Sequence, residues 1–128
     1  MSKRISKHYY DELQNWLESI EFYIQALIKL EERLNEIVLR NSIVDIAAKV
    51  EVHQLLLEKI MDKLHRIQIE LKIHESELKV DDIFIDDEKI SDEMDATHIA
   101  LTEKVKSAEK EFIDVKYYCN SFLTETLK

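Results

Sequence analysis

The chain has 128 residues and contains neither glycine nor proline. Glycine is the usual residue where the backbone enters the left-handed region, and proline punctuates loops. Their absence disfavours folds built from tight β-hairpins, whose preferred turns draw on glycine. It also excludes glycine-rich phosphate loops and dinucleotide-binding fingerprints, because those sites need glycine. We therefore expect an all-α protein.

Apolar residues recur at alternating steps of three and four, which is the spacing of one face of an α-helix. The pattern predicts three helices, over about residues 8–39, 43–80 and 91–126. Their matched lengths favour a single domain folded as an up-down-up antiparallel three-helix bundle. The apolar seam over 43–80 is regular, as in coiled coils. Its positions are Ile43, Ile46, Val50, His53, Leu57, Ile60, Leu64, Ile67, Leu71, His74 and Leu78.

The phase of the apolar pattern breaks near residue 41. Asn41 tolerates the left-handed conformation that ends many helices. Ser42 is a suitable N-cap for the next helix, and Asp45 follows it three residues later. We expect a tight turn here. The alternative is one continuous helix that passes through this point in a swapped dimer.

Negative charge is concentrated in one segment. The net charge at pH 7 is −9, and residues 81–95 hold eight acids against Lys89, which leaves −2 for the rest of the chain. This balance argues against nucleic-acid binding, which needs a basic footprint. No helix has the basic face of a membrane-surface helix, and no apolar run approaches the ~18 residues that read as a transmembrane span. The single cysteine and the lack of a signal sequence predict a cytoplasmic protein.

Two histidines occupy seam positions that an antiparallel bundle brings to one level. With turns centred near residues 41 and 85, His74 lies near His98, and His8 and Tyr9 lie close by. Neutral imidazoles are common ligands of zinc and related metals. Asp95 shares a helix face with His98, so His74, His98 and Asp95 form a candidate divalent-metal site. The alternative is a hydrogen-bonded pair, since the Glu-x-x-His motifs of di-iron bundles are missing.

At the opposite end, the same arithmetic places His53 near Cys119 and Tyr117. A histidine beside a cysteine can activate a thiolate nucleophile. Nothing in the sequence supplies an oxyanion hole or an orienting group. A cysteine on a seam usually behaves as a small buried apolar residue. We therefore expect no enzyme activity and no bound cofactor other than the candidate metal.

The acidic segment over residues 81–90 surrounds a short apolar run. An extended run flanked by acids suits docking onto a partner's sheet edge or basic groove. Calcium binding is a second interpretation, although the EF-hand pattern and its glycine are missing. In a third interpretation the apolar run closes the end of the bundle. The candidate docking residues are Asp81, Asp82, Ile83, Phe84, Ile85, Asp86 and Asp87.

Some apolar residues fall outside the three seams. Four of them lie on the second helix: Val52, Leu56, Ile69 and Ile73. If exposed, they form a patch that suggests association with another protein or with a second copy of the chain. We therefore expect a non-catalytic protein–protein interaction module, such as a scaffold, an adaptor, a small chaperone-like protein or a homodimer. The alternative function is a divalent-metal-binding helical bundle with a His74/His98 site.

Overall fold

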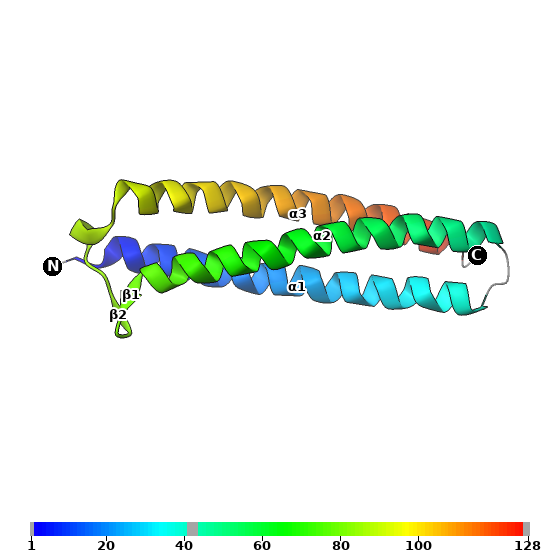
Figure 1. Ribbon diagram of the computed structural model, residues 1–128, viewed down its shortest axis with the longest axis horizontal. Helices are drawn as coiled ribbons and strands as arrows, with labels where there is room; N and C mark the ends of the chain where they lie inside the picture. Colours follow the sequence, from blue (N-terminus) through cyan, green and yellow to red (C-terminus); the bar gives the residue numbers. More distant parts are fainter. Residues whose placement is uncertain (1, 41–43, 127–128) are drawn as a thin grey trace.

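Three long helices lie side by side in a computed structural model that describes residues 2–40 and 44–126 (Figure 1). Helix α1 spans Arg4–Arg40, α2 spans Val44–Glu77 and α3 spans Asp92–Thr126. The expected all-α three-helix bundle is confirmed, with α2 antiparallel to α1 and α3. The turn expected at Asn41 and Ser42 lies outside the described residues. Among those described, no helix is long and apolar enough to cross a membrane.

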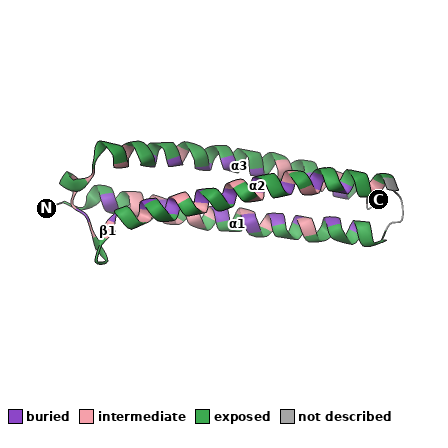
Figure 2. Ribbon diagram, viewed as in Figure 1, coloured by how far each residue is buried: buried purple, intermediate pink, exposed green. Residues whose placement is uncertain are grey.

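The core follows the predicted seams. Buried leucines, isoleucines and valines run along the inward face of each helix, and the outward faces are exposed (Figure 2). His53, His74 and His98 are buried in the same seams. The other seam positions are mostly apolar, so these three buried histidines need a chemical explanation.

Side-chain contacts fix the register between helices. Gln14 Nε2 donates to Glu75 Oε2 at 2.6 Å, where the sequence-based levels put Gln14 beside residue 68. Each Cα–Cβ bond tilts toward the N-terminus of its own helix. In an antiparallel pair, two side chains that meet therefore belong to residues nearer the C-terminus of each helix than the two residues whose Cα atoms lie at the same level. Gln14 thus meets a residue seven positions beyond the predicted one, and part of this offset comes from the tilt of the side chains.

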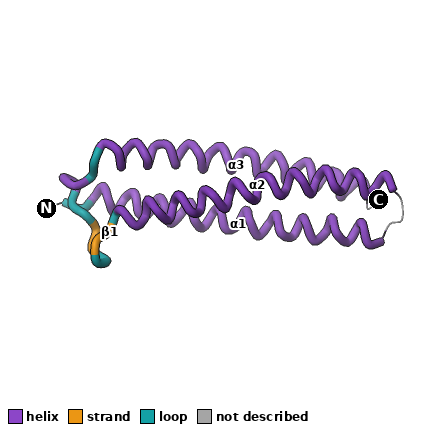
Figure 3. Tube along the Cα trace, in the orientation of Figure 1, coloured by secondary structure: helices purple, strands orange, loops and turns teal. Residues whose placement is uncertain are grey.

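The segment after α2 forms a tight hairpin, which corrects the expectation drawn from the missing glycine. Strands β1 (Lys79–Val80) and β2 (Ile83–Phe84) pair antiparallel, with Val80 opposite Ile83 (Figure 3). The two turn residues, Asp81 and Asp82, have φ of 52° and 63°. A two-residue hairpin turn of the favoured type needs positive φ at both central positions, and aspartate tolerates it better than most residues. The hairpin also ends α2 at Glu77, three residues before the predicted boundary.

The chain after the hairpin closes one end of the bundle and lengthens α1. Asp87 opens a short 3-10 turn, Asp87–Lys89, and its Oδ1 accepts a hydrogen bond from Ile5 N at 3.0 Å. Its backbone N donates to Ser2 O at 2.8 Å. A carboxylate at the start of a helix satisfies an orphan N–H group and favours the helix dipole. This contact explains why α1 begins at Arg4 rather than near residue 8.

Candidate functional site

The expected histidine pair is present at the hairpin end of the bundle. His74 Nε2 of α2 lies 3.1 Å from His98 Nδ1 of α3, and the two residues are 1 % and 4 % exposed. Each occupies a seam position, so ordinary helix packing turns both rings inward. The seam positions, together with an antiparallel turn centred near residue 85, therefore correctly indicated that these rings face each other.

Three side chains of α1 hold His98 in place. His98 Nε2 lies 3.0 Å from Glu12 Oε1, which also contacts His8 Nε2 at 3.1 Å. The ring of Tyr9 stacks on the His98 ring with 3.7 Å between centroids, and Trp16 lies 5.1 Å from it. No role was predicted for Glu12. Its position four residues after His8, on the helix face that carries Trp16, was the available signal.

These contacts determine which ring nitrogen of each histidine carries a hydrogen. The Glu12 carboxylate accepts, so His98 Nε2 carries a hydrogen, and a neutral His98 then presents a lone pair at Nδ1. His74 must donate to that lone pair through Nε2–H. A neutral His74 is left with a lone pair at Nδ1. The assignment follows from the hydrogen-bond network, which is how histidine tautomers are determined when hydrogens are not seen.

The remaining nitrogen of His74 is buried and unpaired. Within residues 2–40 and 44–126, His74 Nδ1 has no hydrogen-bond partner. The carboxylate oxygen Glu77 Oε2 lies 3.5 Å from it. Burial and the neighbouring His98 lower the pKa of His74, while Glu77 opposes that shift. A buried acceptor without a donor costs free energy, which makes this atom the least satisfied point of the site.

The predicted metal-ligand set of His74, His98 and Asp95 does not form as a group. Asp95 Oδ1 instead accepts the hydroxyl hydrogen of Tyr9 at 2.7 Å. That hydrogen bond is the main reason that the pKa of Tyr9 rises to about 12, with burial and nearby carboxylates adding to it. Across the part of the chain that the structure describes, no three histidine, cysteine or acidic residues converge as a metal site.

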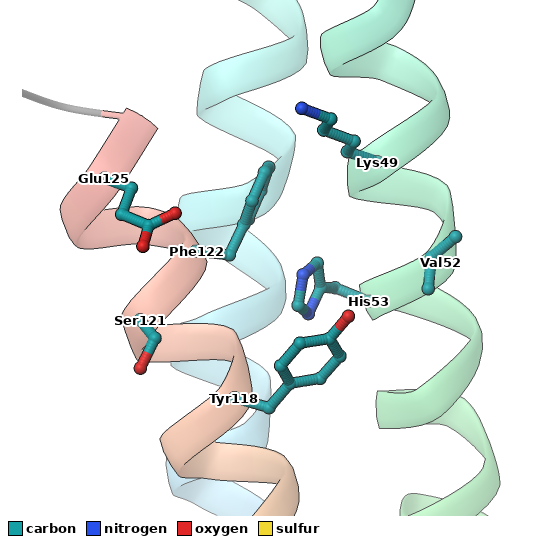
Figure 4. Close-up of a pocket in the computed structure, with 7 residues that line it drawn as sticks. All are labelled: Lys49, Val52, His53, Tyr118, Ser121, Phe122 and Glu125. Atoms are coloured by element: carbon teal, nitrogen blue, oxygen red, sulfur yellow. The ribbon is translucent and has the colours of Figure 1, made fainter.

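The far end of the bundle carries a third buried histidine, at the edge of a hollow of about 340 Å³ between α2 and α3. His53 lies among aromatic rings of α3, with centroids 4.5 Å from Tyr118 and 4.6 Å from Phe122 (Figure 4). Burial lowers the pKa of His53. Cys119 is also buried, and burial raises the pKa of its thiol, which is opposite to what a thiolate nucleophile needs.

Two further hollows lie between α2 and α3, and they adjoin each other at Glu70 and Lys104, whereas the first shares no lining residue with them. The middle one, of about 270 Å³, is lined by Lys63, Arg66, Ile67, Glu70 and Lys104. The one beside the histidine pair, of about 320 Å³, is lined by Glu70, Ile73, His74, Glu77, Thr97, Ala100, Leu101 and Lys104. Ion pairs from Lys63 to Glu111 at 2.7 Å and from Lys104 to Glu70 at 2.9 Å join the two helices between the ends. We call these three hollows together the α2–α3 groove.

The candidate docking residues of the acidic segment do not share one face. Ile83 is exposed on the hairpin, while Phe84 meets the Tyr10 ring edge-on with 5.3 Å between centroids. Ile85 is buried, and its carbonyl accepts from Ser6 Oγ at 2.7 Å. Asp81 and Asp82 are exposed in the turn, whereas Asp86 and Asp87 are half-buried. The apolar run thus serves mainly to close the bundle end.

No protein-family model, no curated protein and no solved structure matches this chain. Its function is therefore argued from the geometry of the histidine pair and the α2–α3 groove. These two features adjoin, because His74 takes part in the pair and also lines the groove.

Proposed function

We propose that this chain is a non-catalytic protein–protein interaction module that receives an amphipathic helix of a partner protein in the α2–α3 groove. The observation that carries the proposal is the position of exposed apolar side chains along the groove. Val52 and Tyr118 are about half exposed at one end, and Ile73 is 58 % exposed at the other. Apolar side chains exposed beside hollows are typical of helix-in-groove recognition.

The spacing of these side chains suits a helix. Val52 and Ile73 are 21 residues apart on α2, which is three heptads and about 32 Å at the rise of an α-helix. Both therefore face the same side of α2. A partner helix of about six turns that lies along the groove reaches both ends and completes a four-helix arrangement.

Charge in the middle of the groove favours one kind of partner. Lys63, Arg66 and Lys104 line the middle hollow together with one acid, Glu70. Lys63 pairs with Glu111 and Lys104 with Glu70, so Arg66 is the cation of this hollow that has no ion pair among the described residues. We infer that the partner helix carries acidic residues at its centre and apolar residues near its ends, because complementary charge sets specificity and orientation.

The chemistry of the buried residues supports a role in binding rather than in catalysis. Cys119 is the one cysteine, and its burial and raised pKa disfavour nucleophilic attack. The cysteine remains a free thiol, as is usual in a reducing compartment, and we propose a cytoplasmic location on that ground.

Site-specific photocrosslinking tests the proposed surface. A photoreactive phenylalanine analogue replaces Val52 or Ile73 in the groove, and matched variants carry it at Phe22 on α1 or at Ile69 on α2. All four side chains are at least half exposed. We expect the two groove positions to crosslink one common partner, and the two control positions to give no such product. Equal crosslinking from all four positions contradicts a specific groove.

Charge substitution then tests the energetics. Ile73→Lys and Ile69→Lys alter side chains of the same type and nearly equal exposure on the same helix, but only Ile73 lines the α2–α3 groove. We expect Ile73→Lys to weaken partner binding by about tenfold or more, the typical effect of changing an interface anchor, and Ile69→Lys to leave it unchanged. Light scattering measures self-association. A dimer that Ile73→Lys dissociates identifies a second copy as the occupant and overturns the proposed partner protein.

A further inference from the structure

We propose that His74 Nδ1 and Glu77 Oε2 are ligands of a first-row divalent cation of the zinc class, bound where the α2–α3 groove meets the histidine pair. The inference does not depend on the proposed interaction function. It starts from the least satisfied polar atom of the site, because His74 Nδ1 is buried in a residue that is 1 % exposed and has no hydrogen-bond donor in the described ranges.

The distance between the two atoms suits a shared cation. Zinc binds imidazole nitrogen at about 2.0–2.1 Å and carboxylate oxygen at about 2.0–2.2 Å, in tetrahedral geometry. A cation at those distances from both atoms, which lie 3.5 Å apart, has a nitrogen–metal–oxygen angle of roughly 110–120°. At that distance Glu77 favours a hydrogen or a positive charge at Nδ1. In the tautomer that carries its hydrogen on Nε2, a bound cation supplies that charge.

The other ring nitrogen of His74 is held as it is in metal-binding histidines. Such histidines donate their second N–H to an acceptor, often a carboxylate, and this contact fixes the tautomer and orients the ring. Here His74 Nε2 donates to His98, and His98 donates to Glu12. The chain of contacts leaves the lone pair of His74 at Nδ1, on the side of Glu77.

The site is open to solvent through the groove. His74 and Glu77 line the same hollow of about 320 Å³, and the Glu77 side chain is 43 % exposed. Water therefore reaches the remaining coordination positions. Lys104 lines this hollow too, but its ammonium contacts both oxygens of Glu70, at 3.1 and 2.9 Å, so a carboxylate compensates its charge.

This assignment differs from the ligand set that the sequence suggested. Both ring nitrogens of His98 are already engaged, one with His74 and one with Glu12. Asp95 is engaged with Tyr9. His98 thus becomes a positioning residue, and Glu77 replaces Asp95 as the carboxylate ligand.

Calorimetric titration of zinc chloride into the full chain, after treatment with a chelator, tests the site. We expect one zinc ion per chain. Glu77→Gln should weaken binding by at least about tenfold, and His74→Phe should abolish it. Glu58→Gln changes an exposed carboxylate elsewhere on α2 and should bind as the unmodified chain does. Circular dichroism confirms that each variant is folded, and Glu77 is exposed enough for its variant to fold.

Two more controls separate this site from other histidines. His53→Phe removes a buried histidine at the far end, and His8→Ala removes the exposed histidine that contacts Glu12. Both should retain the zinc affinity of the unmodified chain. His98→Gln should lower the affinity by about 10–100-fold, the usual effect of removing an outer-shell partner. Loss of binding in His8→Ala, with binding retained in His74→Phe, overturns the proposal in favour of a surface pair.

Nitrogen-15 spectra of the histidine rings give a readout that a purely structural role does not produce. Before zinc is added at neutral pH, we expect His74 to carry its hydrogen on Nε2 and a lone pair on Nδ1. Zinc should then shift the Nδ1 resonance of His74 and leave that of His53 unchanged. Hydrogens on both nitrogens of His74 in the metal-free protein, or heats of binding that neither Glu77→Gln nor His74→Phe alters, would falsify the site.

Discussion

His74 Nε2 and His98 Nδ1 lie 3.1 Å apart across the interface of α2 and α3, inside seams whose other members, apart from His53, are apolar. The direction of this hydrogen bond follows from Glu12, which accepts from the far side of His98. A polar pair in an apolar seam costs free energy in any register that separates its members, because each is then left unsatisfied. The pair therefore favours one alignment of α2 against α3, as single buried polar residues do in coiled coils.

Protonation of the buried histidines should destabilise the bundle in weak acid. Burial lowers the pKa of His74 and of His53, so both bind protons more readily in the unfolded chain, where histidine titrates near 6.5. The unfolded state then binds more protons as pH falls, and the free energy of unfolding decreases below about pH 6.5, by at most about 1.4 kcal/mol per pH unit for each histidine.

Urea unfolding at pH 7.5, 6.5 and 5.5, followed by circular dichroism, measures this dependence. His53→Phe should flatten the slope, since a phenylalanine does not titrate. A free energy of unfolding that rises on acidification over this range contradicts the prediction.

Cys119 should resist thiol reagents while the protein is folded. Its residue is 1 % exposed, and burial raises the pKa of its thiol, so both access and thiolate formation are suppressed. Labelling with a chromogenic disulfide at pH 8 should be slow in buffer and rapid in urea. As a control, Cys119→Ala combined with Ser121→Cys moves the thiol to a partly exposed position that lines the His53 hollow. That variant should react rapidly in the folded state.

The phenol of Tyr9 should ionise late, well above the ordinary pH for tyrosine. Its hydrogen bond to Asp95, together with burial, raises its pKa to about 12. Absorbance at the phenolate band should show a late step that Tyr9→Phe removes and that Asp95→Asn moves toward pH 10, the ordinary value for tyrosine. Tyr117→Phe, at an exposed position, should keep the late step. Persistence of that step in Tyr9→Phe assigns it to another tyrosine.

Residues on the seams were predictable because their positions follow from periodicity alone. The three helices and the meeting of His74 with His98 are of this kind. The partners of the pair were not, because Glu12 and Glu77 lie off the seams, where periodicity does not decide which helix a side chain meets. Glu77 follows His74 by three residues, and that spacing puts the two side chains on one face of α2.

The register of α1 against α2 shows a second limit of prediction from the sequence. Gln54 donates to Asn35 at 2.8 Å and Gln68 donates to Glu21 at 3.0 Å, in the same register as Gln14 and Glu75. Apolar seams accept a shift of one heptad at little cost, because the same face stays buried. The sequence-based estimate of which residues lie at the same height in the bundle also left out the tilt of side chains toward each N-terminus. Off-seam contacts are therefore what distinguishes the observed register.

The hairpin turn offers a test of how a chain without glycine makes a left-handed turn. Asp82 has a φ of 63°, where a side chain with a Cβ atom is disfavoured and glycine is not. Asp82→Gly should raise the free energy of unfolding by up to about 1 kcal/mol, because glycine is preferred in such turns. Asp82→Val should lower it by about 1–2 kcal/mol, since a β-branched residue is poorly accommodated at this φ.

Asp82→Asn controls for charge, because it removes the carboxylate from the acidic segment and keeps tolerance of the left-handed region. Urea unfolding ranks the four proteins, and we expect stability to fall in the order glycine, asparagine, valine at position 82. A valine variant as stable as the asparagine variant would show that Asp82 is not held in the left-handed conformation in solution.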